Sequence, residues 1–409
     1  MAQREGTLPA PGLAAGVIDR LIEAAGRRFF QWCPEGRLTV RFPSGRERTI
    51  GRPDAWPAAA FSINRYRVLW RSIMRATNGF ADSYMDGDVD IDDLVQLFTF
   101  FLRNEKRLNE SAGNMIDIGR SDRRFHAHHR NTEEGSRENI HAHYDLGNAF
   151  YAQWLDETMT YSSAYFEGGA KTLKEAQEAK YRNICEALAV RPGEHIFEIG
   201  CGWGGFAEFA ALNYGARVTG ITISEEQLKF ARERLASAGL AERTDIRFLD
   251  YRKSEGAFDH VVSIEMIEAV GEEFWPVYFR TVAERLKPGG RAAIQAITID
   301  EDYFDGYRSN VDFIQRYIFP GGMLLTDSAI RENSALAGMS ADCVLAFGKS
   351  YAETLRRWRR RFLDAWESIE PLGFDERFSR MWQYYLAYCE TGFDEKRIDL
   401  GLYRLEKPA

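Results

Sequence analysis

The sequence predicts an α/β protein, a Rossmann-like doubly wound sheet with a smaller α+β domain on its N-terminal side. Three observations carry this prediction. From about residue 141 onward, short apolar runs typical of strands alternate with longer amphipathic runs typical of helices. A turn rich in glycine, "GCGWGG" at 200–205, joins the first of these strands to an alanine-rich helix. The first 115 residues follow another pattern, and a polar, charged stretch separates them from the rest.

The composition limits the class of protein. The chain has 409 residues, of which 45% are hydrophobic and 13% aromatic, which suffices for two or three domains with a large core. The net charge of −8 argues against a mainly electrostatic nucleic-acid binder, and we expect no nucleic-acid partner. Five cysteines lie far apart without a CxxC pair, which fits a reducing, cytoplasmic compartment. We find no signal peptide and no run of about 18 apolar residues, so any membrane association is expected to be peripheral.

The N-terminal part has its own elements. Residues 13–30 carry apolar side chains at helical spacing, 36–51 alternate around "PSG" as a hairpin does, and 90–104 are typical of a capped apolar helix. We therefore expect an accessory domain over 1–115, a linker over 116–140 and a larger domain over 141–409.

The larger domain alternates strands and helices in chain order. Its expected strands are 195–200, 217–224, 245–250, 258–265 and 291–299. Its expected helices are 204–215, 225–239 and 273–290, and residues 350–392 are helical again, with many aromatic and arginine side chains.

The glycine turn at 200–205 predicts where a ligand binds. In an open α/β sheet, ligands bind beyond the carboxyl ends of the strands, where glycine lets the backbone approach closely and a helix N-terminus offers N–H donors. A glycine turn alone is a weak signal, but polar residues in "GITISEEQ" (220–227) and Asp250 follow the next two strands. The turn has no P-loop lysine. We expect a nucleoside cofactor, and S-adenosylmethionine fits better than NAD.

Several segments carry a resemblance to a known family. The chain resembles class I S-adenosylmethionine-dependent methyltransferases, and more narrowly the cyclopropane-fatty-acid synthase family that includes the mycolic-acid methyltransferases. The resemblance covers roughly residues 140–400. The matching segments are "HYDLGNAFYAQWLDETMTYSSAYF" (143–166), "AQEAKYRNI" (176–184), "EIGCGWGG" (198–205), "GITISEEQ" (220–227), "DYR" (250–252), "SIEMIEAVG" (263–271), "LKPGG" (286–290) and "FIQRYIFPGG" (313–322).

The resemblance implies a set of cofactor-binding residues. Thr222 and Gln227 can hydrogen-bond the ribose or the amino acid of the cofactor, and Tyr251 can cover its adenine ring. The whole implied set is Tyr161, Ser162, Gly200, Gly202, Ile221, Thr222, Gln227, Tyr251, Arg252 and Ile264.

The resemblance also implies a reaction. An acyl double bond attacks the sulfonium methyl group, a carbocation forms, and a base removes a proton. Loss of the proton from the new methyl group closes a cyclopropane, and loss from a neighbouring carbon gives a methyl-branched alkene. Aromatic side chains can stabilise the cation, and the proton needs a positioned base.

The residues expected to hold the base depart from the family's pattern. The family commonly uses a bicarbonate held by Cys, Glu, His and Tyr, and these positions match Ser163, Glu268, Gln295 and, less clearly, Arg359. Ala269 replaces the histidine that usually follows the glutamate. Either bicarbonate binds to Ser163 and Gln295, or Glu268 is itself the base with a pKa raised by burial. A methylated, uncyclised product stays open.

The substrate side is expected to reach a membrane surface. The helices at 13–30 and 355–366 either lie at the interface or pack on the protein. An aromatic cluster after the last predicted strand either lines an acyl tunnel or forms core, and the match at "YIFPGG" favours a functional role for Tyr317. That cluster comprises Tyr303, Phe304, Tyr307, Phe313, Tyr317 and Phe319.

The predicted function is methyl or methylene transfer to the cis double bond of unsaturated phospholipids at the inner face of the membrane, giving a cyclopropane or a methyl branch. Methylation of another apolar acceptor and a non-catalytic lipid- or cofactor-binding protein are the alternatives, because the base site is altered. An accessory reductase and a homodimer stay open.

Three further signals favour structural roles. The acidic run "DGDVDIDD" (86–93) lacks the glycine and glutamate of a calcium loop and is typical of a helix cap. The histidines within 126–143 have no complementary cysteine ligands, so we expect no metal site, although His143 opens "HYDLGN". Cys201 is expected to be a small buried residue beside the cofactor.

Overall fold

The computed structural model describes residues 19, 33–112, 131–132, 135 and 146–409. The chain forms two compact units: residues 1–118 with 375–391, and residues 119–374 with 392–409. Residues 375–391 lie in the first unit, whereas they were expected in the larger domain over 141–409. The expected helix at 13–30, the histidines within 126–143 and nearly all of the expected linker lie outside the described residues.

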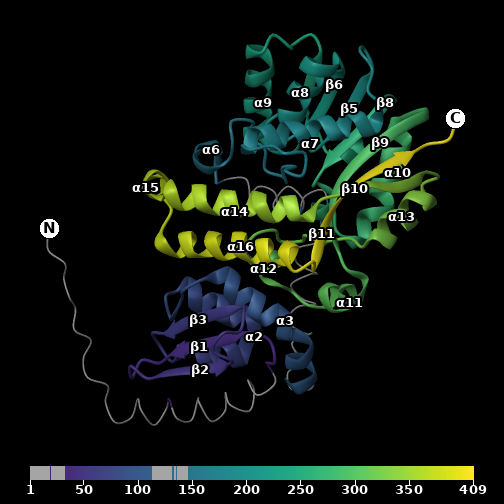
Figure 1. The fold of residues 1–409 in the computed structure, drawn as a ribbon. Coiled ribbons are helices and arrows are strands. Elements are labelled where there is room, and N and C mark those ends of the chain that lie inside the picture. Colours follow the sequence, from purple (N-terminus) through teal and green to yellow (C-terminus); the bar gives the residue numbers. More distant parts are fainter. Residues whose placement is uncertain (1–18, 20–32, 113–130, 133–134, 136–145) are drawn as a thin grey trace. The chain divides into compact units, whose positions relative to one another are not determined.

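The first unit contains a four-stranded sheet with the strand order β2-β1-β3-β4 (Figure 1). Its strands are β1 (Arg37–Arg41), β2 (Glu47–Gly51), β3 (Ala58–Ile63) and β4 (Val89–Ile91), and its helices include α2 (Arg67–Met85) and α3 (Leu94–Ala112). β1 and β2 pair antiparallel, which confirms the expected hairpin. Leu38 and Val40 of β1 are buried and alternate with partly exposed neighbours, the period-2 pattern of a half-buried strand.

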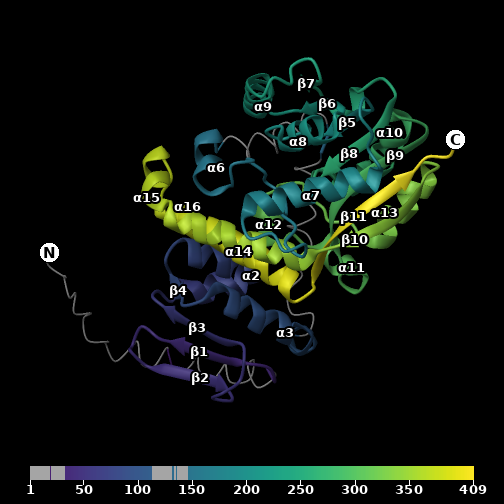
Figure 2. The same ribbon diagram turned by 45° about the horizontal axis from the view of Figure 1, so that its top comes forward.

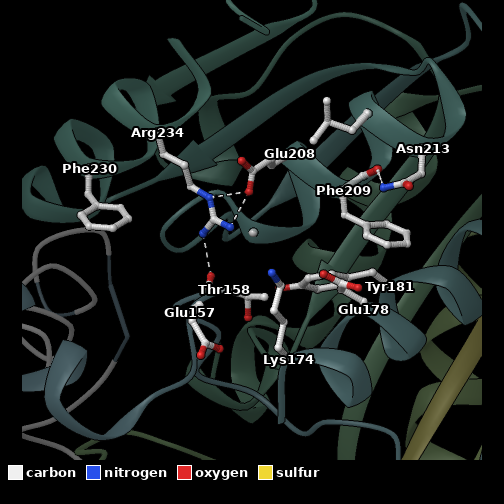
Figure 3. Close-up of a pocket in the computed structure, with 12 residues that line it drawn as sticks. Glu157, Thr158, Lys174, Glu178, Tyr181, Glu208, Phe209, Asn213, Phe230 and Arg234 are labelled. Atoms are coloured by element: carbon white, nitrogen blue, oxygen red, sulfur yellow. Dashed lines mark hydrogen bonds and ion pairs between the residues drawn. The ribbon is translucent and has the colours of Figure 1, made fainter. Parts of the chain in front are cut away.

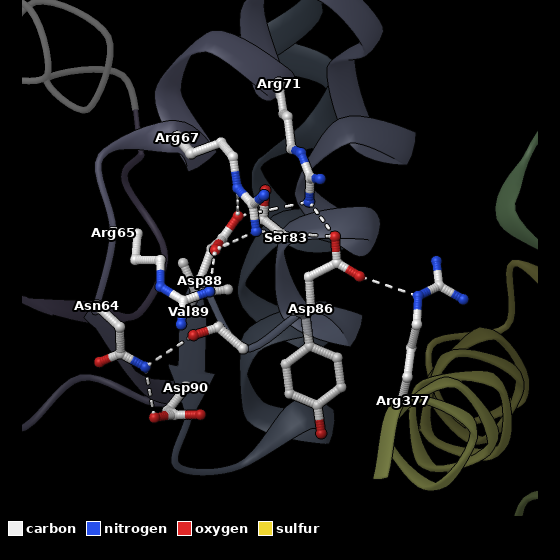
Figure 4. A network of polar contacts seen from close by, with 12 residues as sticks. Asn64, Arg65, Arg67, Arg71, Ser83, Asp86, Asp88, Val89, Asp90 and Arg377 are labelled. Carbon is white, nitrogen blue, oxygen red and sulfur yellow. Dashed lines mark hydrogen bonds and ion pairs between the residues drawn. The ribbon is translucent and has the colours of Figure 1, made fainter. Parts of the chain in front are cut away.

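The acidic run at 86–93 is used for ion pairs and capping. The side chain of Asp88 is fully buried and accepts hydrogen bonds from Arg67 at 2.7 and 2.8 Å (Figure 4). Asp86 accepts from Arg71 at 2.7 Å and from Arg377 at 2.9 Å. Asp93 accepts from backbone amides in the first turn of α3, so this part of the run does cap a helix, as the sequence predicts.

The second unit confirms the predicted fold class. Its seven-stranded sheet has the order β10-β11-β9-β8-β5-β6-β7. The strands from β9 to β7 are parallel, whereas β11 runs antiparallel to β9 and β10. The strands are β5 (His195–Ile199), β6 (Arg217–Thr222), β7 (Thr244–Phe248), β8 (Phe258–Ile264), β9 (Leu286–Ile299), β10 (Ser340–Ala346) and β11 (Ile398–Glu406).

Helices cover this sheet, with α8 and α9 on one side and α10 and α13 on the other (Figures 1 and 2). α7 begins with a capping box between Thr172 and Glu175, and Ser224 caps α9. These helices are α7 (Leu173–Leu188), α8 (Gly205–Tyr214), α9 (Glu225–Ser237), α10 (Trp275–Arg285) and α13 (Asp327–Leu336). Four 3₁₀ turns are Tyr251–Lys253, Ile267–Ala269, Glu272–Phe274 and Glu370–Leu372.

The remaining helices among the described residues are α6 (Asn148–Trp154), α11 (Glu301–Ser309), α12 (Phe313–Tyr317), α14 (Gly348–Asp364), α15 (Trp366–Ile369) and α16 (Glu376–Asp394). α14 packs on β11 and α6. Its Trp358 and Phe362 are fully buried, and Arg361 donates to the backbone oxygens of Trp154 and Leu155 at 2.8 and 2.6 Å. Packing on the protein, rather than a membrane interface, therefore accounts for the apolar side of the helix expected at 355–366. Within the described residues, no helix has the length and apolarity that crossing a bilayer requires.

The strand order positions a ligand site. The chain runs from β5 outward through β6 to β7 and then returns to β8, which pairs with β5 on its other side. The direction of winding reverses between β5 and β8, and ligands of such sheets bind at the carboxyl ends of the strands at this point.

Candidate active site

The glycine turn after β5 has the backbone geometry that only glycine adopts easily. Gly200 and Gly202 have φ angles of +80° and +51°. A Cβ atom on Gly200 would lie 2.9 Å from the side chain of Met266, whereas a Cβ atom on Gly202 would meet nothing within 4 Å. Space therefore lies beside Gly202. Cys201 is buried, and burial raises the pKa of its thiol well above the ordinary value, as expected of a structural rather than a nucleophilic cysteine.

The residues predicted after β6 form a polar pair. Thr222 Oγ1 donates to Gln227 Oε1 at 2.8 Å, so the amide nitrogen of Gln227 keeps its donors for another partner. Both side chains are buried, as is Ile221 at the end of the strand.

The residues predicted after β7 form a tight ion pair. Asp250 accepts from the backbone and the guanidinium of Arg252, with the closest contact at 2.6 Å. Burial alone would raise the pKa of Asp250, but these hydrogen bonds and the charge of Arg252 hold it below its usual value. Arg252 also donates to the backbone oxygen of Asn131 at 3.0 Å. The ring of Tyr251 packs edge-on against Tyr278 with centroids 5.7 Å apart.

Tyr161 and Ser162 lie between an aromatic cluster and a buried lysine. The ring of Tyr161 contacts Trp154 and Trp358 at centroid distances of 5.6 and 5.4 Å. Ser162 Oγ accepts from Lys180 Nζ at 2.7 Å. Lys180 is only 1% exposed, and burial lowers its pKa to about 7 although the neighbouring carboxylates Glu265, Asp156 and Glu198 oppose this change.

Glu265, which directly follows β8, is the centre of the site. One carboxylate oxygen, Oε1, accepts from the backbone N–H of Ser163 at 2.9 Å and from Gln295 Nε2 at 2.6 Å. The other, Oε2, accepts from the hydroxyl of Tyr351 at 2.6 Å. Burial raises the pKa of Glu265, while the charge of Lys180 and the three hydrogen bonds oppose that rise. Sequence reasoning missed both Glu265 and Tyr351.

Glu268 supplies a second carboxyl group close by. Its Oε1 accepts from the backbone N–H of Ile297 at 2.6 Å. Its Oε2 is buried and has no hydrogen-bond partner among the described residues. Burial, together with the charge of Glu265, raises the pKa of Glu268 to about 8. The expected rise is present, whereas the role of Glu268 as a base stays a prediction.

The other predicted catalytic residues divide into two groups. Ser163 and Gln295 do meet at Glu265, but the hydroxyl of Ser163 donates to Ala164 O at 2.9 Å, so its backbone rather than its side chain faces the carboxylate. Tyr317 lies on α12 with its ring 5.2 Å from that of Phe313. The segment after α12 approaches Glu268 through its backbone, because Met323 N donates to Glu268 O at 2.8 Å.

The family's tyrosine was matched less clearly to Arg359 of α14. The residue of α14 whose hydroxyl donates to Glu265 is Tyr351, eight residues earlier. α14 is tied to the Ser163 segment: Ala164 N donates to Thr354 Oγ1 at 3.1 Å, and Phe166 N donates to Ser350 Oγ at 3.0 Å. These bonds bring Tyr351 to Glu265. A tyrosine near the start of the predicted helix was the available sequence signal.

A separate pocket of about 450 Å³ lies among α7, α8 and α9 (Figure 3). Arg234 crosses it and donates to Glu208 at 2.7 Å and to the backbone oxygen of Thr158 at 2.6 Å. None of the predicted site residues lines it, so it is distinct from the carboxyl ends of β5 and β8.

The residues at those strand ends fit S-adenosylmethionine. The open space beside Gly202 admits a ligand, and Gln227 retains an amide donor. Glu198, two residues before Gly200, has a buried Oε2 without a hydrogen-bond partner among the described residues, and burial raises its pKa to about 8 although Lys180 opposes this. A buried acceptor without a protein partner is expected where a ligand donates, and the amino group of the cofactor is such a donor.

Comparisons with known proteins match the chain to one family. The family model described as "Mycolic acid cyclopropane synthetase" matches residues 131–402. Tuberculostearic acid methyltransferase UfaA1 of Mycobacterium tuberculosis is 38% identical over 365 residues, covering 87% of this chain and 82% of that protein. The cyclopropane-fatty-acyl-phospholipid synthase of Escherichia coli is 37% identical over 337 residues, covering 81% of this chain and 83% of that protein.

A solved structure adds the cofactor and the fold. The mycolic acid cyclopropane synthase CmaA1, complexed with SAH and CTAB, is 28% identical with a TM-score of 0.63, covering 66% of this chain and 98% of that chain. SAH is the demethylated product of S-adenosylmethionine. The chain therefore belongs to the mycolic acid cyclopropane synthetase family and is an S-adenosylmethionine-dependent methyltransferase of the cyclopropane synthase type.

Proposed function

We propose that the chain transfers a methyl group to the cis double bond of an unsaturated phospholipid acyl chain and releases a methyl-branched, uncyclised chain. The observation that carries this proposal is the pair Glu265 and Glu268, two carboxyl groups at the carboxyl end of β8 beside the predicted cofactor residues. A reaction through a carbocation needs a proton acceptor at such a place.

The residues of the site divide the work. S-adenosylmethionine, when bound, supplies an electrophilic methyl group. Gly200 and Gly202 let the backbone approach the cofactor, while Thr222, Gln227 and Glu198 supply polar groups to hold it. The predicted residues Tyr251 and Ile264 complete the adenosyl side.

The carbocation formed in the proposed reaction is stabilised by electron-rich side chains and by the exclusion of water. Tyr161 lies against Trp154 and Trp358, and the faces of such rings attract positive charge. Trp154 and Trp358 are fully buried, which keeps water from the cation.

Two observations favour an uncyclised product. The positions at which the family holds bicarbonate carry Ser163 and Gln295, and the backbone N–H of Ser163 and the side-chain amide of Gln295 already donate to Glu265. The 38% identical relative is named a methyltransferase. The second candidate is a cyclopropane, favoured by the name of the 37% identical Escherichia coli relative. The two carboxyl groups and the glycine turn argue against a non-catalytic binding role. Methylation of another apolar acceptor is the alternative if no unsaturated lipid reacts.

We propose that the protein acts at the inner face of a membrane and binds there peripherally. Trp70, Ile73 and Met74, which are 65%, 61% and 56% exposed, follow helical spacing on α2 and could insert among headgroups. A methylene product would need an accessory reductase to become a saturated branch. We also propose that the protein assembles as a homodimer.

The test is a product analysis. Purified protein is incubated with S-adenosylmethionine and vesicles of cis-monounsaturated phospholipid, and the acyl chains are analysed by mass spectrometry before and after hydrogenation. A gain of one CH₂ with the double bond retained supports the branched product. The same gain without a double bond assigns cyclopropane synthesis instead. No gain on any unsaturated lipid contradicts the proposed function.

A further inference from the structure

We propose that Glu265 is the catalytic base that removes the proton after methyl transfer, and that the reaction needs no dissolved bicarbonate. This inference rests on the proposed function and assigns the chemistry of its central residue. Three independent features of the site carry it: the hydrogen bonds to the carboxylate, the backbone at Glu265 and the charges around it.

The first feature is a ring of donors made for an anion. A backbone N–H, an amide N–H and a phenolic O–H come from segments around 163, 295 and 351, and all three end on the carboxylate of Glu265. Residues distant in sequence thus converge on one carboxylate. Ser163 and Gln295 are the positions where the sequence analysis expects bicarbonate, so the side chain of Glu265 fills the place of that anion.

The second feature is the backbone. Glu265 has a φ angle of +50°, a conformation that non-glycine residues rarely adopt and that is commonly retained for function. Its N–H donates to Gln295 O at 2.8 Å, which fixes this geometry against β9. A glycine would adopt the same backbone without strain, so the side chain itself is what the position retains.

The third feature is the set of charges. Lys180 of α7 favours the ionised form of Glu265, and the protonated form can still arise because the direct partners are all uncharged. Glu268 also faces it, and its own pKa of about 8 makes it mostly a neutral acid near neutral pH. Glu265 is therefore the better acceptor, and the hydroxyl of Tyr351 positions it.

The two electrons of the acyl double bond form a carbon–carbon bond to the methyl group, and the electron pair of the broken carbon–sulfur bond stays on sulfur. The neighbouring carbon becomes a cation. A proton passes from an adjacent carbon to Glu265, whose carboxylate becomes a carboxylic acid, and the released C–H electron pair forms the new double bond.

The first test compares Glu265→Gln with the matched control Glu186→Gln, which changes an exposed carboxylate on α7. Turnover is measured in carbon dioxide-free buffer, with cofactor binding followed by calorimetry. We expect the wild-type protein to be indifferent to added bicarbonate and Glu265→Gln to lose about 100-fold or more in turnover while it still binds cofactor. The control should keep its turnover. Near-normal turnover of Glu265→Gln, or a wild-type requirement for bicarbonate, would overturn the assignment.

The second test uses Glu265→Gly, which suits the positive φ angle and so preserves the fold. We expect ¹³C-labelled bicarbonate to bind this variant without cofactor or lipid, seen by NMR line broadening, and not to bind the wild type. Bicarbonate or formate should also restore part of its turnover. If the folded variant neither binds these anions nor regains turnover with them, Glu265 has a structural role and the assignment as base is wrong.

The two proposals fail separately. If the wild-type protein modifies no unsaturated lipid, the proposed function is wrong. If the wild type makes product and Glu265→Gln does too, only the assignment of the base is wrong.

Discussion

Each unit of the molecule has a buried acidic centre, and the two differ in what surrounds the carboxylate. In the first unit, Asp88 is bonded by the guanidinium groups of Arg65, Arg67 and Arg71 (Figure 4). In the second unit, Glu265 is bonded by three uncharged donors. Guanidinium partners tie a carboxylate into the structure as an ion pair, whereas neutral donors leave it able to exchange a proton. A carboxylate thus stabilises the first unit, whereas we propose a chemical role for the one in the second unit.

The largest expected effect is the loss of stability on replacing Asp88, the buried carboxylate of the first unit. Asp88→Ala removes the common partner of Arg67 and Arg71, which join the start of α2 to β4. We expect the free energy of unfolding to fall by about 2–4 kcal/mol, measured by urea denaturation. Asp54→Ala, at an exposed site in the same unit, is the control and should change little. Equal stability of Asp88→Ala and wild type would show that the arginines simply return to water.

The next effect concerns pH and Glu268. Its pKa in the folded protein, about 8, lies above the ordinary 4.5, so the folded state holds a proton that the unfolded state loses between these values. The stability contributed by this proton is full below about pH 4.5 and is lost as pH rises through about 8. Because glutamine does not ionise, Glu268→Gln should reduce the stability difference between about pH 5 and pH 8 by about 3 kcal/mol. Parallel pH–stability curves would contradict the raised pKa.

A smaller effect is expected at Tyr351. Tyr351→Phe removes the hydroxyl that bonds Glu265 but keeps the ring, which stacks on Phe393 with centroids 4.5 Å apart. One hydrogen bond to a charged group corresponds to about a tenfold fall in kcat, with the KM for cofactor unchanged. A rise in KM alone would assign Tyr351 to binding rather than to the base.

The smallest effect is expected at Ser163. Its backbone N–H holds Glu265 and its hydroxyl bonds Ala164 O, so Ser163→Ala should keep turnover within about twofold. Ser162→Ala, which removes the hydrogen-bond acceptor of Lys180, should lower turnover more than Ser163→Ala does. The reverse order would mean that the hydroxyl of Ser163 acts on the substrate.

Most of the fold of the second unit could be predicted from the sequence, because the alternation of strands and helices and the glycine turn are local patterns. The strands from β5 to β9 and the glycine turn at 200–205 were predicted within a few residues. The largest difference is at residues 286–290, which were expected to end a helix and instead begin β9. β10 and β11 were missed, since a C-terminal antiparallel pair lacks the strand–helix alternation that identified the others.

The centre of the site was hidden for the opposite reason. Glu265 gains its significance from Ser163, Gln295 and Tyr351, which are 102, 30 and 86 residues away in the chain. Glu268 was predicted because the family uses a glutamate at its position, whereas Glu265, three residues earlier in the same matching segment, was assigned no role. Only the folded backbone brings these donors together.

The ring of donors around Glu265 has a consequence for the physiology of the cell. A dissolved anion occupies such a ring only in proportion to its concentration, which follows the supply of respiratory carbon dioxide. A carboxylate attached to the chain is present in every molecule at all times. With Glu265 as its base, this enzyme would modify lipids at a rate that does not vary with the bicarbonate concentration of the cell.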